Sequence, residues 1–320
     1  MEPGNACPIC GGTLRLIAHR NDKYSYYSCQ SCTHVTCLPL PTAQEIAEFY
    51  NGFLFGKSTQ QKFEKTKGTI IDSVRRILSD VARIADLRAP LDLLDWGGGT
   101  GFYSNAFAEL GCDVTMIDID SQACDYAQTA FGPKFHIITA DPLRHQFTRK
   151  YDVVFCNQVI EHYPDPFAML SAIKAVLSPR GVLIVTTPNQ GCKEFWFRRD
   201  WLLAYLQMTV RRSIQLPGAF GRFLKTPWIC CDPPRHLHAF NKASLSRLFS
   251  NAGFTVLETW GEYSTSQYYS KPTRFDWQIR RVLSLVRIVE DIPNRAGIAL
   301  LNKLDPNGRW GNNLVAYACL

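Results

Sequence analysis

The sequence lacks any apolar run of the roughly 18 residues that would cross a bilayer as a helix. Residues 1–5 include neither the basic stretch nor the apolar stretch that opens a secretory signal. Internal repeats and low-complexity tracts are also absent. These absences predict a cytoplasmic protein, which could associate with a membrane only by binding to its surface.

Charged residues are few, at 20% of 320 residues, and hydrophobic residues make up 46%, a composition that predicts an ordinary packed core. The formal net charge is +7, but the basic excess is concentrated between residues 191 and 226. Such a local excess favours an anionic small molecule or a membrane surface. Nucleic-acid binding more often shows a broader basic footprint.

Twelve cysteines without an export signal indicate a reducing compartment, where paired cysteines hold metal more often than they form disulfides. Four of them form two C-x2-C pairs separated by eighteen residues: Cys7, Cys10, Cys29 and Cys32. We predict a zinc site on two knuckles joined by a hairpin, with strands at 13–19 and 24–28. Four protein ligands leave no open position, so this zinc would be structural. His34 and Cys37 are spare and are expected on the module's surface.

Strands and helices alternate in the middle of the chain, which predicts an α/β fold with a parallel sheet. Strands are expected at 91–95, 113–118, 135–139, 151–155 and 181–186, and helices at 70–84, 102–110, 121–132 and 166–177. A helix at 242–251 and strands at 254–258 and 313–318 follow. We divide the chain into a zinc ribbon (1–40), a helical linker (41–87), a Rossmann-like core (88–190), an aromatic-basic substrate cover (191–240) and a closing part with a helical insertion (241–320).

A glycine-rich turn follows the first core strand, at residues 95–101. Gly97, Gly99 and Gly101 allow a sharp bend close to a ligand, and the next helix offers free N–H groups. The G-x-G-x-G spacing differs from that of dinucleotide enzymes, which leaves an oxidoreductase as a distant alternative. Asp118 ends the second strand and Asp141 follows the third, where acids can bind a ribose and an adenine. This joint pattern predicts a nucleoside site.

These segments, with 151–162 and 177–189, resemble class I S-adenosylmethionine-dependent methyltransferases. The resemblance is closest to the broad group that includes ubiquinone-biosynthesis O-methyltransferases and sugar methyltransferases. It covers about residues 88–260 and the final strand, and it implies a seven-stranded Rossmann-like sheet with an antiparallel seventh strand. It also implies roles for single residues. The three glycines would line the methionine part, with Asp95 beside them; Asp118 would bind ribose, Asp141 would lie by adenine and Asn157 would border the sulfonium. Trp96 is bulkier than the family's usual residue.

Methyl transfer to an alcohol needs a base, and the candidates are His162, His236 and His238. His162 fits equally well as a support for the cofactor loop, and His236 as part of a loop packed over the pocket. Some ubiquinone-pathway relatives carry an extra acid before the Glu-His pair and are thought to use a divalent cation. Gln158 stands at that position here, which argues against a cation.

The apolar residues from 195 to 210 end in Arg211 and Arg212. They predict either a buried lid helix or an amphipathic membrane contact through 195–225 that admits a lipid-linked substrate. The overall prediction is methyl transfer from S-adenosylmethionine to an oxygen or carbon of a small molecule, a sugar or a lipid-linked acceptor. The alternatives are an RNA methyltransferase that binds RNA with its ribbon, and a non-catalytic scaffold. The few basic residues of the ribbon argue against RNA, and the intact glycines and acids argue against a scaffold.

Overall fold

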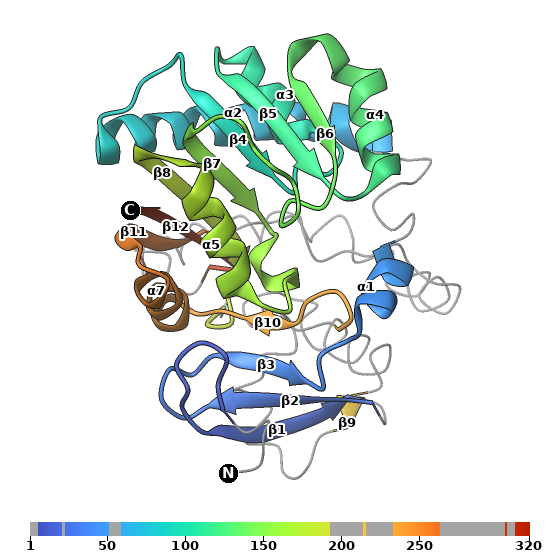
Figure 1. The fold of residues 1–320 in the computed structure, drawn as a ribbon, viewed down its shortest axis with the longest axis vertical. Helices are drawn as coiled ribbons and strands as arrows, with labels where there is room; N and C mark the ends of the chain where they lie inside the picture. Colours follow the sequence, from blue (N-terminus) through green and yellow to red (C-terminus); the bar gives the residue numbers. More distant parts are fainter. Residues whose placement is uncertain are drawn as a thin grey trace, which may run out of the picture.

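A computed structural model describes residues 6–20, 23–50, 59–192, 214–215, 233–262, 305 and 311–320. Two sheets organise these residues, one of seven strands and one of five. Figure 1 shows the five-stranded sheet at one end of the molecule, with β10 at its edge toward the seven-stranded part. The membrane-contact segment predicted at 195–225 and the helical insertion predicted within 241–320, which we place at 272–303 from its basic, helical pattern, fall almost wholly outside the described residues. Within the described part, no helix is both long and apolar enough to span a membrane.

The seven-stranded sheet has the order β11-β12-β8-β7-β4-β5-β6. Its strands are β4 (Asp92–Trp96), β5 (Asp113–Asp118), β6 (His136–Thr139), β7 (Tyr151–Asn157), β8 (Leu177–Pro188), β11 (Thr255–Glu262) and β12 (Asn313–Cys319). The strands from β4 to β8 are parallel, whereas β12 pairs antiparallel with both of its neighbours. The predicted α/β fold class, with its antiparallel closing strand, is confirmed.

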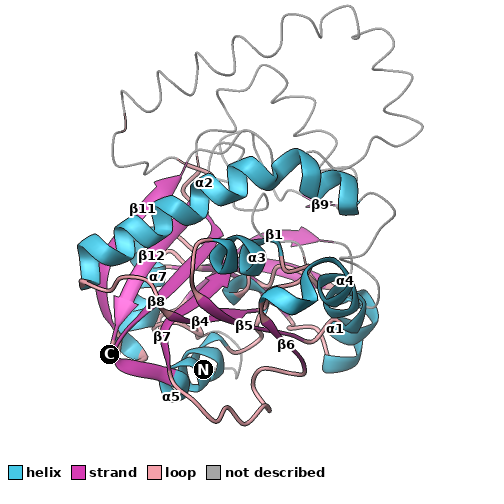
Figure 2. Ribbon diagram, turned by 90° about the horizontal axis from the view of Figure 1, so that it is seen from above, coloured by secondary structure: helices cyan, strands magenta, loops and turns pink. Residues whose placement is uncertain are grey.

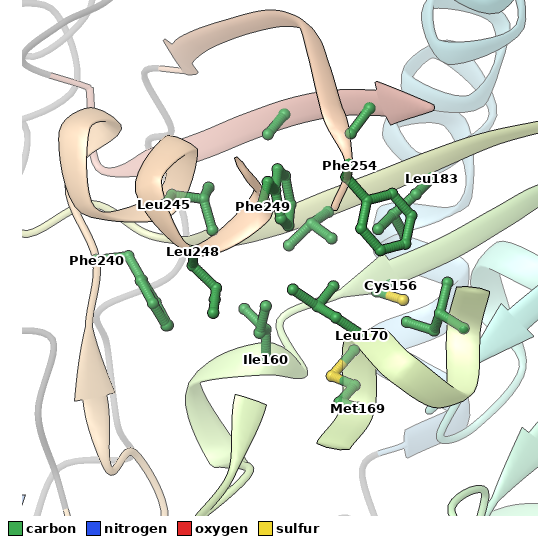
Figure 3. Packing of buried hydrophobic residues seen from close by; sticks show 14 of the residues in the cluster. Cys156, Ile160, Met169, Leu170, Leu183, Phe240, Leu245, Leu248, Phe249 and Phe254 are labelled. Atoms are coloured by element: carbon green, nitrogen blue, oxygen red, sulfur yellow. The ribbon is translucent and has the colours of Figure 1, made fainter. Parts of the chain in front are cut away.

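Helices cover both faces of this sheet, because alternate strand residues point to opposite sides. Leu93 lies in the core beneath α2 (Thr59–Ala85), α3 (Phe102–Glu109) and α4 (Ser121–Phe131), and Leu94 lies in the core beneath α5 (Pro166–Val176) and α7 (Lys242–Asn251). Figure 2 shows α2 running along one face with α5 on the other. Figure 3 shows Leu248 of α7 and Leu170 of α5 in the core that contains Leu94. Asp120, Asp165 and Asn241 cap the N-termini of α4, α5 and α7.

Short elements complete the chain. The part predicted as a helical linker contains α1 (Ala43–Tyr50) and the first residues of α2, which begins well before the predicted helix at 70–84. Single 3-10 turns follow α4 and β7, at η1 (Gly132–Lys134) and η2 (Ile160–His162). The second of these turns carries part of the candidate site.

The five-stranded sheet is antiparallel and has the order β10-β3-β2-β1-β9. Its strands are β1 (Leu14–Arg20), β2 (Tyr24–Cys29), β3 (Val35–Leu38), β9 (Ile214–Gln215) and β10 (His238–Ala239). The hairpin of β1 and β2 was predicted, but β3 and its pairing with β10 were not. The prediction that His34 and Cys37 lie on the surface is wrong. Both are fully buried, because β10 and the core close over this side of the module.

Candidate functional site

The turn between β4 and α3 bends at three glycines. Gly97, Gly99 and Gly101 have φ values of 77°, 55° and 74°, in the left-handed region that glycine adopts without steric cost. The Gly97 N–H donates to the Ile117 carbonyl at 2.8 Å, which ties the turn to the end of β5. Gly101 is the N-cap of α3 and makes no side-chain hydrogen bond, and the positive end of the helix dipole there suits an anionic ligand group.

Asp118 lies beside this turn, at the end of β5. Its Oδ2 accepts a hydrogen bond from the Gly99 N–H at 2.8 Å, and its Oδ1 accepts one from the Asp120 N–H at 2.8 Å. Burial raises the pKa of the carboxyl, and these two N–H groups oppose the rise. A carboxylate only accepts hydrogen bonds, and this is the chemistry that binds a pair of ribose hydroxyls.

The other predicted cofactor residues follow neighbouring parallel strands, whose carboxyl ends meet at one edge of the sheet. Asp141 comes after β6 and accepts the Leu143 N–H at 3.0 Å. Asn157 ends β7, and its Oδ1 accepts the Thr186 hydroxyl at 2.5 Å. Asp95 is buried within β4 and accepts the Ser104 hydroxyl at 2.6 Å. Burial raises the pKa of the Asp95 carboxyl to about 7.

Trp96, next to the turn, is accommodated by the apolar core. Its indole is fully buried, and Nε1 donates to the Tyr163 hydroxyl at 3.1 Å. The ring stacks on Phe147, with 5.9 Å between centroids. The bulk of this residue is therefore taken up by packing with residues that follow β6 and β7.

The structure brings the two predicted catalytic histidines together. The rings of His162 and His236 lie 4.8 Å apart between centroids, although the residues come from η2 and from the segment before β10. The His162 Nε2 lies 3.8 Å from Oε1 of Glu161, which is fully buried. The other oxygen of Glu161 accepts the Thr187 hydroxyl at 3.0 Å. Our sequence prediction omitted Glu161, although it directly precedes His162.

The protonation of this cluster follows from its burial. The His162 Nδ1 lies 2.9 Å from the Arg235 carbonyl, so this nitrogen carries the proton and donates it. Burial lowers the pKa of His162 to about 4 and raises that of Glu161 to about 8. At neutral pH the cluster therefore has a neutral imidazole with its Nε2 lone pair beside a carboxyl that is mostly protonated.

One ligand atom from each of Glu161, His162 and His236 falls within 4.8 Å of the others, so the set has the composition of a cation site. The side chain of Gln158, the residue in place of the relatives' extra acid, is bonded elsewhere. Its backbone has a φ of 60°, and its amide donates to the Thr186 hydroxyl at 3.3 Å.

The four predicted zinc ligands converge. The sulfurs of Cys7 and Cys32 are 3.7 Å apart, and those of Cys10 and Cys29 are 3.5 Å apart. All four sulfurs lie within 4.8 Å of one another. Sulfurs bound at about 2.3 Å to one tetrahedral zinc are separated by about 3.8 Å, so the cluster fits this ion.

The two knuckles share one backbone pattern. The Gly11 N–H donates to the Cys7 carbonyl at 2.9 Å, and the Thr33 N–H donates to the Cys29 carbonyl at 3.0 Å. Gly11 and Thr33 both have a positive φ, of 70° and 58°. Each pair of cysteines is thus held on a closed turn, which directs the sulfurs toward one another.

Comparison with known proteins agrees with this geometry. A family model described as "Methyltransferase domain" matches residues 68–259, which is well over half of the chain. The chain belongs to this methyltransferase family. The resemblance predicted from the sequence and the seven-stranded methyltransferase fold are both confirmed.

Individual relatives of the methyltransferase match only part of it. It is 34% identical over 112 residues to the ubiquinone biosynthesis O-methyltransferase of Haemophilus ducreyi, covering 32% of this chain and 48% of that one. The corresponding protein of Paraburkholderia phytofirmans is 34% identical over 110 residues, covering 33% and 47%. The chain therefore spans about half the length of these relatives. The crystal structure of magnesium protoporphyrin IX methyltransferase from Synechocystis PCC 6803 covers 87% of this chain and 99% of its own, at 17% identity and a TM-score of 0.48.

Proposed function

We propose that this methyltransferase transfers a methyl group from S-adenosylmethionine to an oxygen or carbon of a small-molecule acceptor. The contact between the Gly99 N–H and the Asp118 carboxylate carries the proposal. It places a helix N-terminus, which suits the carboxylate of a methionine, next to an acid that suits a ribose. Ligands with both groups on one molecule are few, and S-adenosylmethionine is the one that a methyltransferase family uses.

The roles proposed for single residues follow the order of the sheet edge. Gly97, Gly99 and Gly101 would hold the methionine part, and Asp118 would hold the ribose. Asp141 would lie by the adenine, and Asn157 would border the sulfonium. Asp95 would support the turn from its buried side, because its carboxyl accepts a hydrogen bond from the Ser104 hydroxyl at the start of α3.

S-adenosylmethionine supplies the reactive methyl group, and the protein aligns the acceptor and excludes water. Alignment alone is worth about 7–11 kcal/mol of the barrier. For an alcohol acceptor, His162 or His236 would take the proton while the acceptor oxygen attacks the methyl carbon. The neutral state of His162 supports this role, because a base must be unprotonated before it acts. Glu161, which lies beside the His162 ring and is mostly protonated at neutral pH, would help to fix the position of the imidazole.

The proposal covers sugar and lipid-linked acceptors as well as other small molecules. The segment 195–225 was predicted from its sequence as a membrane contact, and most of it lies outside the described residues. Sedimentation with liposomes of neutral lipid, and with liposomes that contain an anionic lipid, tests it. Co-sedimentation with the anionic liposomes supports a lipid-linked acceptor, and its absence with both removes that option.

Titration calorimetry with S-adenosylhomocysteine tests the proposed cofactor site. We expect binding by the unchanged chain and a loss of roughly tenfold or more in affinity for Asp118→Ala, because two hydroxyl contacts are lost. Asp125→Ala is the matched control, because Asp125 is an exposed acid of the next helix. Binding that is equal in all three proteins would remove Asp118 from the site, and no binding by the unchanged chain would favour a scaffold. Tight, salt-dependent binding of RNA would instead favour the RNA alternative.

A further inference from the structure

The segment from His236 to Asn241 is held between the methyltransferase core and the zinc module. On the core side, the Leu237 N–H donates to the Glu161 carbonyl at 2.8 Å. On the module side, the Cys37 N–H donates to the Leu237 carbonyl at 3.1 Å. The backbone of Leu237 therefore connects β3, through its carbonyl, to the turn that carries Glu161 and His162, through its N–H.

Two buried histidines continue this connection. The His34 Nε2 lies 3.1 Å from the His238 Nδ1, and both side chains are at most 1% exposed. The ring of Phe240 lies 4.8 Å from that of His34. His34 comes two residues after the zinc ligand Cys32, so its side chain joins the second knuckle to the His236 segment directly.

Helix α7 contacts both knuckles. Its N-cap residue, Asn241, donates from Nδ2 to the Thr33 hydroxyl at 2.8 Å, and Thr33 closes the second knuckle. Its last residue, Asn251, donates from Nδ2 to the carbonyl of Ile9 in the first knuckle, at 2.9 Å. Ile9 lies in the same buried cluster as Leu248 of α7. The helix is therefore docked along the module at its two ends, and the His236 segment leads directly into it.

The cofactor turn has its supports elsewhere. Gly97 and Gly99 bond to Ile117 and Asp118 of β5, on the far side of the sheet order from β11 and α7. A change in the zinc module therefore has a direct path to His236, but only an indirect one to the turn.

We propose that the zinc module positions the acceptor side of the active site: the ion fixes the second knuckle, and His34 and His238 transmit its position to His236. This inference rests on the proposed function, in which His162 and His236 face the acceptor. His34 and His238 are positioning residues, because they act through the segment and touch no reacting group. The ribbon is then part of the wall of the site, because strands from both parts of the chain share its sheet.

Hydrogen exchange measured by mass spectrometry tests this without knowledge of the acceptor. In the zinc-loaded protein, we expect His34→Leu to keep one zinc per chain and to bind S-adenosylhomocysteine within about twofold of the unchanged protein. The amides of 236–241 should exchange roughly tenfold faster, because the segment has lost a buried partner. His34→Gln can replace the hydrogen bond at the same reach and should restore slow exchange. His19→Leu, an exposed histidine on β1, is the matched control and should leave exchange unchanged.

Removal of zinc by a chelator is the second arm. Faster exchange in 236–241, with protection retained in β4 and β5, supports the proposal. If protection is lost everywhere, the zinc-loaded His34→Leu protein decides instead. Unchanged exchange in 236–241 of that variant would overturn the inference. Absence of S-adenosylhomocysteine binding by the unchanged, zinc-loaded protein would be a separate result, because it would overturn the proposed function and not the coupling.

Discussion

His34 and His238 share a buried hydrogen bond of 3.1 Å although 204 positions separate them in the chain. One belongs to the zinc knuckle and the other to the strand β10, which precedes α7. Each imidazole is closed off from water, so each depends on the other for part of its hydrogen bonding. The bond is therefore a local measure of how firmly the module and the core are joined.

Stability measurements should detect this bond. We expect His34→Leu and His238→Leu each to lower the free energy of unfolding by about 1–3 kcal/mol, because each leaves a buried polar partner. The double variant should lose less than the sum, with a coupling of about 0.5–3 kcal/mol. Urea unfolding of the four proteins measures this. Losses that simply add would show that the two rings do not interact.

The glycine turn should not tolerate the methyl group that a glycine-to-alanine substitution adds. Gly97→Ala combines a φ of 77° with a Cβ that would lie 2.8 Å from a methyl of Val159. We expect affinity for S-adenosylhomocysteine to fall by roughly tenfold or more, since the turn must shift by a part of an ångström to relieve the contact. Gly68→Ala in α2 is the control, because a Cβ there meets open space and favours the helix by about 0.5–1 kcal/mol. Equal affinity in Gly97→Ala would mean that the turn does not contact the ligand.

Glu161 should make the protein less stable as the pH rises toward about 8. Burial raises the pKa of its carboxyl to about 8, so between about 4.3 and 8 the folded state keeps a proton that the unfolded state releases. The free energy of unfolding then falls by up to about 1.4 kcal/mol per pH unit. His162, with its pKa lowered to about 4, gives the opposite slope below about 6.5. Asp95, with its pKa raised to about 7, adds to the fall up to that pH, so the slope of Glu161 is clearest in the window from about 7 to 8.

Urea unfolding across that window compares the unchanged protein with Glu161→Gln. The variant should have the flatter pH dependence, and the exposed Glu48→Gln should follow the unchanged protein. The facing groups His162, His236 and Arg235 are the same in all three proteins, so they cancel in the comparison. Parallel curves for the unchanged protein and Glu161→Gln would contradict the raised pKa.

Zinc content should depend on the four clustered cysteines alone. We expect about one zinc per unchanged chain and a clear loss for Cys10→Ser, because a hydroxyl is a poor substitute for a thiolate. Cys319→Ser, at the end of β12, should keep its zinc. Atomic absorption of dialysed protein measures the content. Full zinc in Cys10→Ser would exclude this residue as a ligand.

The sequence predicted features whose signals are local. The glycines of 97–101, the acid at Asp118 and the cysteine pairs each require a particular residue type at a particular place, so a pattern reveals them. The parallel sheet also followed from strand-helix alternation, whereas the antiparallel closing strand came from the family resemblance.

The burial of His34 had no such signal. It arises from pairing between β3 and β10, and neither strand is long enough to show an apolar period of its own. The partnership of His162 with His236 was hidden for the same reason, since 74 positions separate the two residues. Glu161 could have been predicted as a site residue from the sequence, because a buried acid beside a candidate base is a common arrangement.

The pairing of β3 with β10 also has a consequence for biosynthesis. A ribosome adds about 5–20 residues per second, so the edge of β3 waits on the order of 10–40 s for its partner strand to emerge. During that interval the outer edge of β3 has no partner strand, and such an exposed edge can pair with the wrong strand. Early binding of zinc by the knuckles would hold β3 in its folded position until β10 has been synthesised.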